Sequence, residues 1–314
     1  MNAVTEGTQL TDQTKLGLYH KFNVTRTDGS SEPGGKHHDD EYFVLNLTTD
    51  KHAMPALAAY AEACAVEYPA LAADLRKKIV ASSLVDSEFV LVPESKLPNG
   101  HVEPAFLVAR YLSSKGPAGI PQSTPAGEPW IEIDYHDARA ACESAGLKLI
   151  TELQWLALAH DIANQDANWT GGKVGEGSIY QGLHKDTVSS AQPGNYESTD
   201  PEERRWFVLS NGEKVFDFAG NAYSWVFDNV QGDDAGLVAQ AFAADSPSIA
   251  TAPYPSMEKG VGWIPKASSG WSGSALIRGG CWSSGGDAGV FYLGGGWPDD
   301  GGDFVSFRCT KSLG

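Results

Sequence analysis

The residue types that most often perform chemistry are sparse in this sequence and poorly spaced for it. Cysteine occurs four times, at Cys64, Cys142, Cys281 and Cys309, and no CxxC pair is present. Neither a zinc knuckle nor a dense disulfide framework is therefore encoded. Cys281 and Cys309 are able to pair in an oxidising compartment. Four free thiols is the interpretation we favour, because intracellular disulfides are rare.

A different kind of chemistry is concentrated near the C-terminus. Residues 279–302 contain ten glycines among 24 residues, interleaved with Ser, Asp, Tyr and Trp. In binding loops, aromatic residues supply rigid contact area, while Ser, Gly and Asp supply adaptable hydrogen bonds. A segment this rich in glycine cannot hold its shape by side-chain packing alone, so we expect the preceding domain to support it.

The overall composition excludes several classes of protein. The 314 residues carry 23 Lys and Arg against 40 Asp and Glu, which gives a formal charge of −17. This charge argues against nucleic acid as a partner, because binding a polyanion depends on Lys and Arg. Hydrophobic residues make up 41% of the chain, enough for a sizeable core. The 35 glycines and 17 prolines indicate many turns and exclude a helical bundle.

The sequence also lacks the signals of membrane insertion and export. No run approaches the ~18 apolar residues that a membrane span needs. The first residues, MNAVTEGTQLTDQTK, do not place an apolar stretch after a basic one. We therefore expect no membrane insertion and no Sec-type export, with a location in the cytoplasm or in a phage particle.

Residues 1–80 are predicted to form a small N-terminal β-β-α unit whose role the sequence does not define. Residues 18–28 and 41–47 are enriched in β-branched and aromatic residues, as strands are. Asp50 stands where a helix N-cap would, ahead of an alanine-rich helix expected over residues 53–78.

Residues 81–314 are predicted to form a second, larger domain with much irregular structure. Short strands are expected from Phe89 onward. One helix should be capped by Asp134 and stopped by Gly146. A second helix should begin at the capping box formed by Thr151 and Gln154.

Four segments of this second domain occur in an order that resembles a known family. They are PWIEIDYHDARAACESAGLKLITELQWLALA, KVFDFAGNAYSWVFD, ALIRGGCWSSG and VSFRC. This order is similar to the formylglycine-generating-enzyme-like (sulfatase-modifying factor) branch of the C-type lectin fold. The resemblance spans roughly residues 85–314, and it implies an α+β, loop-rich domain with small twisted sheets and two helices. Arg278 and Arg308 are expected to be buried and to tie strands to loop carbonyls.

The catalytic residues of that family do not carry over. Its enzymes oxidise cysteine with copper, and they resemble one another in two cysteines just after the RGG motif. Here RGG is followed by Cys281, Trp282 and Ser283, and no second cysteine follows nearby. A lone thiol cannot supply a two-thiolate copper site. We therefore predict no catalytic residues and no enzyme activity, with a formylglycine-generating-type oxidoreductase as one alternative.

The resemblance also implies a calcium site around the AGN turn. The ligands would be Asp217, Gly220, Ala222 and a glutamate at position 224, where this chain has Ser224. Losing a carboxylate weakens an all-oxygen calcium site. Calcium is accordingly the one cofactor considered, and the alternative is that Asp217 only caps its loop.

The last forty residues resemble the variable region of proteins diversified by diversity-generating retroelements. Such regions keep a fixed frame and vary the positions between. The frame survives here as Arg278, Gly279, Gly280, Trp282, Ala288, Gly289, Val290, Phe291, Phe307, Arg308 and Cys309, with Cys281 in place of serine and Ser306 in place of glycine. The variable region would span about 276–309.

The resemblance assigns ligand binding to the positions between the frame residues. These are Ser283, Ser284, Gly286, Asp287, Tyr292, Gly294, Gly296, Trp297, Asp299, Asp300, Gly302, Asp303, Phe304 and Ser306. The implied function is a non-catalytic receptor or adhesion-type protein that binds an unidentified protein or cell-surface ligand. A calcium-dependent carbohydrate-binding lectin module is a further alternative. Since few interface residues carry most of the affinity, Tyr292, Trp297 and Phe304 are expected to dominate binding.

Overall fold

The chain divides into two compact units, residues 1–53 and 54–314, whereas the sequence predicts a boundary near residue 80. The structure is a computed structural model and describes residues 22–47, 50, 52–85 and 87–313. Within the first unit, the described residues form turns held by local contacts. Asp28 accepts hydrogen bonds from the Ser30 amide at 3.0 Å and its hydroxyl at 2.6 Å, and His37 pairs with Asp40.

The two strands predicted near the N-terminus are wrong where the structure can test them. Residues 22–28 and 41–47 are not in strands, and residues 18–21 lie outside the described part of the chain. Phe43 is 76% exposed, and its neighbours Tyr42 and Val44 are exposed as well. A two-stranded hairpin is at best marginally stable without a third strand or a packed face. The β-branched and aromatic enrichment alone was therefore insufficient to form a sheet.

The predicted helix over residues 53–78 is two helices, α1 (Ala53–Ala63) and α2 (Pro69–Val85). The break falls just before Pro69, which cannot donate a backbone hydrogen bond and disfavours a helical residue before it. Met54 and Leu57 of α1 pack with the fully buried Ile79 of α2 in one hydrophobic cluster.

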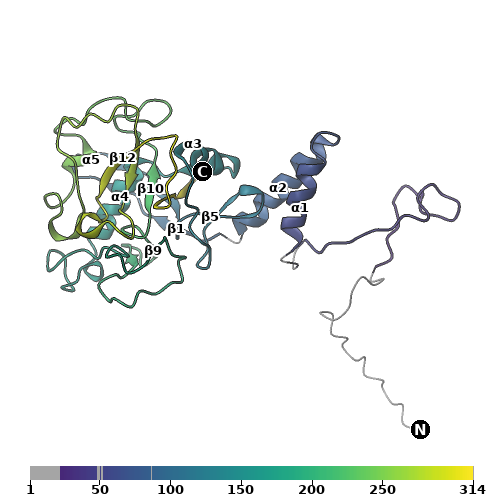
Figure 1. The fold of residues 1–314 in the computed structure, drawn as a ribbon, viewed down its shortest axis with the longest axis horizontal. Helices are drawn as coiled ribbons and strands as arrows, with labels where there is room; N and C mark the ends of the chain where they lie inside the picture. Colours follow the sequence, from purple (N-terminus) through teal and green to yellow (C-terminus); the bar gives the residue numbers. More distant parts are fainter. Residues whose placement is uncertain (1–21, 48–49, 51, 86, 314) are drawn as a thin grey trace, which may run out of the picture. The chain divides into compact units, whose positions relative to one another are not determined.

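The second unit is built on two four-stranded sheets with strands of two to four residues (Figure 1). The first sheet has the order β1-β4-β14-β7 and the second has the order β12-β11-β10-β13. Their bounds are β1 Phe89–Val92, β4 Phe106–Ala109, β7 Lys148–Leu149, β10 Tyr223–Val226, β11 Ala275–Arg278, β12 Leu293–Gly296, β13 Val305–Phe307 and β14 Cys309–Ser312. Three two-stranded ribbons complete the set: β2 Ser95–Lys96 with β3 Val102–Glu103, β5 Ser114–Lys115 with β6 Pro121–Gln122, and β8 Trp206–Val208 with β9 Lys214–Phe216.

Two helices of the second unit begin where the sequence predicts. Helix α3 (Tyr135–Ser144) is capped by Asp134, whose side chain accepts from the Asp137 amide, and Gly146 follows it at a φ of 69°. Helix α4 (Glu152–Ala163) begins with the predicted capping box of Thr151 and Gln154. Helix α5 (Pro247–Ala250) is a single turn.

Large aromatic side chains fill the core between these elements. Trp155 of α4 stacks on Phe218 with ring centroids 3.8 Å apart, and its indole nitrogen donates to the Val290 carbonyl at 2.9 Å. Trp225 of β10 donates to the Ile133 carbonyl. Burying one such side chain contributes roughly 1.5–3 kcal/mol. The tryptophans thus order long loops that have little regular structure of their own. Within the described ranges, no helix is both long enough and apolar enough to cross a bilayer.

Candidate functional site

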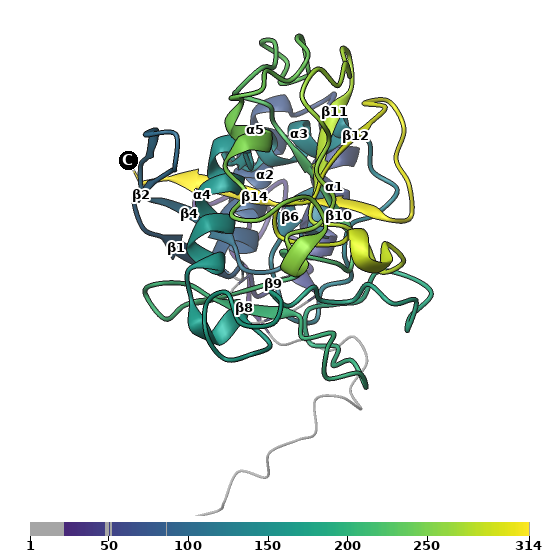
Figure 2. The ribbon, with the colours of Figure 1, turned by 90° about the vertical axis from the view of Figure 1, so that its left-hand side faces the viewer.

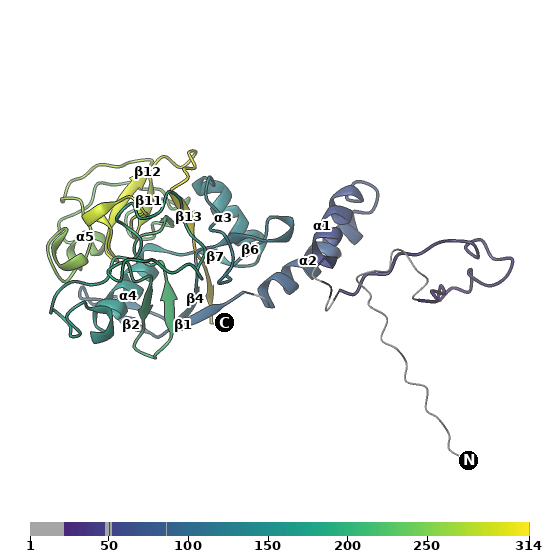
Figure 3. The ribbon, with the colours of Figure 1, turned by 60° about the horizontal axis from the view of Figure 1, so that its bottom comes forward.

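The C-terminal segment enters and leaves the second sheet on either side of one strand. Strand β11 pairs antiparallel with β10, and β13 pairs parallel with the other edge of β10, so that Ser224 lies between Arg278 and Ser306. Strand β12 extends the sheet beyond β11. Figures 2 and 3 show β11 and β12 together, with the yellow loops of the segment running out from them. Two loops, residues 283–287 and 297–304, leave this sheet, and we call them the contact loops.

The two frame arginines anchor both ends of this segment, as the sequence predicts. Arg278 is fully buried and forms a two-pronged ion pair with the equally buried Glu152, while donating to the Phe291 carbonyl at 2.9 Å. Arg308 donates to the carbonyls of Ala109 and Asp217 at 2.8 and 3.0 Å. Burial lowers the pKa of Arg308 to about 10, so it stays charged at neutral pH.

Close backbone packing fixes the base of the first contact loop. Gly280 has a φ of 91°, and a Cβ at this position would come within 2.7 Å of Ala288. Only glycine combines this left-handed backbone with this approach. Ten of the eleven frame residues are buried, and Trp282 is partly exposed. Buried positions of this kind tolerate few substitutions.

Tyr223, at the start of β10, brings three parts of the segment together. Its hydroxyl lies 2.9 Å from the Ser284 hydroxyl, and its ring lies 5.2 Å from that of Tyr292 and 6.0 Å from that of Phe304. Its amide also donates to the Phe304 carbonyl at 2.8 Å. Burial raises the pKa of both Tyr223 and Tyr292 above its usual value. The two contact loops and Tyr292 therefore converge on one neighbourhood of the surface.

Most of the positions predicted to bind ligand reach solvent. Trp297 is 75% exposed and Phe304 is 44% exposed. The exposed positions are Ser283, Gly286, Trp297, Asp299, Asp300, Asp303 and Phe304, and the partly exposed ones are Ser284, Asp287, Tyr292, Gly296 and Gly302. The contact loops hold ten of these twelve.

Two of the predicted positions are buried and do not fit a contact role. Ser306 lies in β13 with no exposed surface, and Gly294 lies in β12. All three residues of β13 are buried, and in β12 both Leu293 and Gly294 are buried, so these strand positions lie inside the fold. Ser284 also has an internal role, because its hydroxyl accepts from the Cys281 amide at 2.8 Å.

The second contact loop is fastened through its backbone and leaves its side chains outward. The Tyr135 amide donates to the Pro298 carbonyl, and the Glu132 amide donates to the Gly302 carbonyl, both at 3.0 Å. Asp299 lies 3.6 Å from the exposed His136 imidazole. Because the loop is held by main-chain bonds, its side chains can change without loss of the anchoring contacts.

The predicted calcium site does not fit the structure. Asp217 is almost fully buried, and both of its carboxylate oxygens accept hydrogen bonds from Arg205 at 2.7 Å. Gly220 lies in a tight turn at a φ of 72°, and Ala222 is buried. An arginine on the carboxylate occupies the oxygens that a cation would need. Asp217 thus anchors its loop through Arg205, which agrees with the alternative expectation that it has a structural role in this loop.

The structure agrees with four free thiols, the favoured expectation, and does not bring together Cys281 and Cys309, the pair that the sequence left open. Cys309 lies beside Cys142 of α3, with the two sulfur atoms 2.9 Å apart, whereas Cys281 contacts Ser283 and Ser284. All four cysteines are buried free thiols. Burial, followed by the interaction with Cys309, raises the pKa of the Cys142 thiol well above its usual value.

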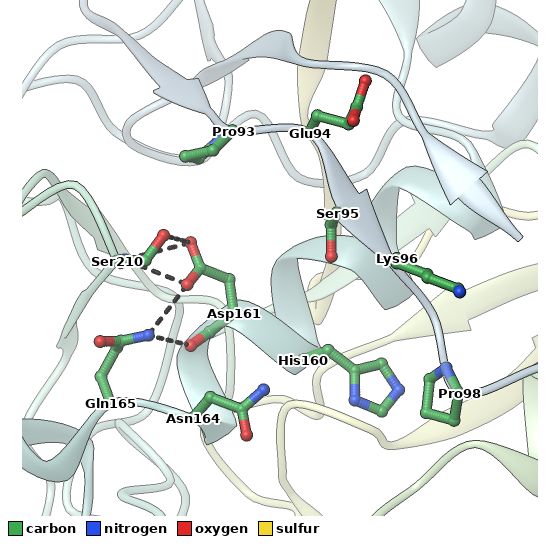
Figure 4. A pocket seen from close by; sticks show the side chains of 10 residues that line it. All are labelled: Pro93, Glu94, Ser95, Lys96, Pro98, His160, Asp161, Asn164, Gln165 and Ser210. Carbon is green, nitrogen blue, oxygen red and sulfur yellow. Dashed lines mark hydrogen bonds between the residues drawn. The ribbon is translucent and has the colours of Figure 1, made fainter. Parts of the chain in front are cut away.

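A cavity of about 360 Å³ lies elsewhere on the second unit (Figure 4). It is bordered by the end of α4 and the segment that leads from β1 into β2. Its Asp161 carboxylate accepts from the Ser210 amide and hydroxyl and from the Gln165 side chain. The carboxylate is therefore satisfied by the protein itself, and we assign this cavity no chemistry.

Sequence reasoning missed three residues that shape the site. Tyr223 and Trp263 contact the segment from outside it, and Glu152 neutralises Arg278. Acidic residues are common in the first turn of a helix. The position of Glu152 in α4 therefore did not by itself indicate that it pairs with Arg278.

The chain belongs to the family of the sulfatase-modifying factor enzyme 1-like domain, whose model matches residues 107–313. Its fold is accordingly the formylglycine-generating-enzyme-like form of the C-type lectin fold. No curated protein sequence matches the chain.

Several solved structures are similar in fold. Treponema denticola variable protein 1 is 12% identical, with a TM-score of 0.38, over 72% of this chain and 94% of that one. The crystal structure of CarF is 11% identical, with a TM-score of 0.43, over 73% and 99%. The Major Tropism Determinant I1 variant is 13% identical, with a TM-score of 0.32, over 73% and 55%.

Proposed function

We propose that this chain is a non-catalytic ligand-binding protein of receptor or adhesion type, whose C-terminal segment is varied by a diversity-generating retroelement. The observation that carries the proposal is the alternation of burial along residues 278–309. Frame residues are buried almost without exception, and the positions between them reach solvent in the contact loops.

This alternation is what a diversified surface requires physically. Substitutions at exposed positions typically change stability by less than about 0.5 kcal/mol, whereas truncations in a core cost roughly 2–5 kcal/mol. Variation confined to the contact loops changes recognition while the fold survives. The side chains there are aromatic, acidic and small, the mixture that serves binding loops.

The oxidoreductase alternative receives no support from the thiols. Cys281 has hydroxyl groups as its neighbours, at 3.3 and 3.4 Å, and Cys309 lies against Cys142 instead. The lectin alternative would need Asp217 free for calcium, but that carboxylate is paired with Arg205.

The proposal is tested by randomising two matched sets of positions in the full chain. One set is Ser283, Asp287, Trp297, Asp299, Asp300 and Asp303, and the other is the frame set Ala288, Val290, Phe291 and Phe307. Displayed variants are sorted for protease resistance, which reports folding, and then sequenced. We expect nearly all substitutions to survive in the first set and few in the second.

Equal intolerance of the two sets would contradict the proposal. A second, independent readout is the gene's surroundings. We expect a reverse transcriptase gene nearby and a near-copy of the 3′ end that differs mainly at adenines; their absence would remove the retroelement from the proposal.

A further inference from the structure

A continuous row of aromatic rings runs from the contact loops into constant parts of the chain. Starting from Phe304, successive ring centroids lie 6.0, 5.2 and 6.3 Å apart through Tyr223, Tyr292 and Trp263. Trp263 then stacks on Trp271 at 6.3 Å with an angle of 21° between the rings. We call these five residues the aromatic row. Tyr223, Trp263 and Trp271 lie outside the variable segment.

Trp263 is held in this row by its backbone. Its amide donates to the Asp287 carbonyl, and its carbonyl accepts from the Leu293 amide, both at 2.9 Å. The neighbouring Val261 carbonyl accepts from the Phe291 amide at 2.8 Å. Residues 261–263, which lie outside the variable segment, therefore run alongside it in the manner of an additional strand. Trp263 is partly exposed and lies next to Tyr292, and the hydrogen bonds that hold it come from main-chain atoms.

Within the variable segment, the charges around the aromatic row have a single sign, whereas the constant part of the row carries the exposed Lys266 between Trp263 and Trp271. Residues 279–307 contain four aspartates (Asp287, Asp299, Asp300 and Asp303) and no lysine or arginine. The flanking Arg278 and Arg308 are fully buried and committed to internal partners. Among the residues that the structure describes, His136 is the ion-pair partner found for these aspartates.

We propose that the aromatic row completes the ligand-binding surface, and that the partner it fits is a polypeptide surface presenting lysine or arginine side chains. This inference rests on the proposed function and adds to it three constant residues and the chemistry of the partner. A cation over the face of Trp or Tyr is attracted by the negative face of the ring's quadrupole. Surrounding carboxylates attract the same cation over a longer range and speed its association.

The test uses the full chain and a displayed library of random twelve-residue peptides. Peptides are selected on the immobilised wild-type chain, and the retained pool is sequenced. We expect the pool to be enriched in Lys and Arg over the unselected library. The best binders are then measured against defined variants by surface plasmon resonance at low and high salt.

Three variants and two matched controls locate the binding. D299N/D300N/D303N should slow association about tenfold at low salt, whereas E62Q/E67Q/E94Q removes as much charge from exposed positions elsewhere and should change it less than about twofold. Trp263→Leu should weaken binding about fivefold, and Trp263→Phe, which keeps a ring, should restore most of it. W297A/F304A should abolish it.

Each outcome decides between the two claims. A pool that binds through Trp297 and Phe304 but has no basic enrichment, or is indifferent to Trp263→Leu, overturns this inference and leaves the proposed function intact. If the selected peptides bind the W297A/F304A variant as well as the wild type, or if no peptide is retained, both this inference and the proposed function are contradicted. Near-ultraviolet circular dichroism of each variant separates lost contacts from lost folding.

Discussion

The contact loops and the strands β12 and β13 belong to one continuous segment, yet they differ in how much space surrounds a side chain. In the loops, Gly286 has nothing within 4 Å of the place where a Cβ would stand. In β12, a Cβ on Gly296 would meet the Trp225 ring at 2.8 Å. We therefore expect the space around the Cβ, rather than position in the segment alone, to decide which residues tolerate substitution.

The largest effect is expected at the buried ion pair. Arg278→Met leaves Glu152 as an unpaired charge with no exposed surface, and this should lower the free energy of unfolding by about 3–5 kcal/mol. Urea denaturation measures the loss. The double variant R278M/E152L should recover a large part of it, because no buried charge then remains; a double variant as unstable as the single one would contradict this explanation.

Acid should weaken the frame through His160, which contacts Phe291 edge-on with centroids 5.0 Å apart. Burial lowers the pKa of His160 to about 4, against about 6.5 in the unfolded chain. Between these values the unfolded state binds more protons, so the stabilisation is present above pH 6.5 and is lost as the pH falls. We expect about 2.5 kcal/mol less stability at pH 4.5 than at pH 7.5 from this group.

Comparison with His160→Gln isolates the contribution of that side chain. The variant should show a shallower dependence of unfolding free energy on pH between 7.5 and 4.5. Parallel curves for the two proteins would show that other groups carry the acid sensitivity.

Matched glycine substitutions test the contrast between loop and strand directly. Gly296→Val should destabilise the protein by roughly 1–3 kcal/mol, because Trp225 must move. Gly286→Val should change stability by less than about 0.5 kcal/mol. Thermal melting of both variants measures the difference. Similar losses at the two positions would remove the basis of the contrast.

The smallest effect on stability is expected at the most exposed aromatic residue. Trp297→Ala should leave the melting temperature within about 2 °C of the wild type while lowering affinity for peptides selected on the surface. Tyr292→Ala should reduce both, since its ring packs between those of Tyr223 and Trp263. A fall in melting temperature for Trp297→Ala without loss of binding would make this residue part of the scaffold.

The sequence predicted the second unit well because its signals are local or are carried by motifs. The caps at Asp134 and Thr151 and the buried roles of Arg278 and Arg308 are all confirmed. The N-terminal strands failed because strand composition is informative only where a partner sheet exists. The ion pair of Asp217 with Arg205 and the contacts of Tyr223 depend on tertiary proximity, which no local pattern in the sequence encodes.

The pairing of β10 with both β11 and β13 has a consequence for how this protein can evolve. Since Ser224 lies between Arg278 and Ser306, the entry and exit points of the C-terminal segment are separated by two strand spacings, about 10 Å. Between these points, the loop of residues 297–304 carries the exposed Trp297, Asp299, Asp300, Asp303 and Phe304, whereas the frame residues are packed into the core. A change of length in this loop would therefore leave both anchor points and the frame in place.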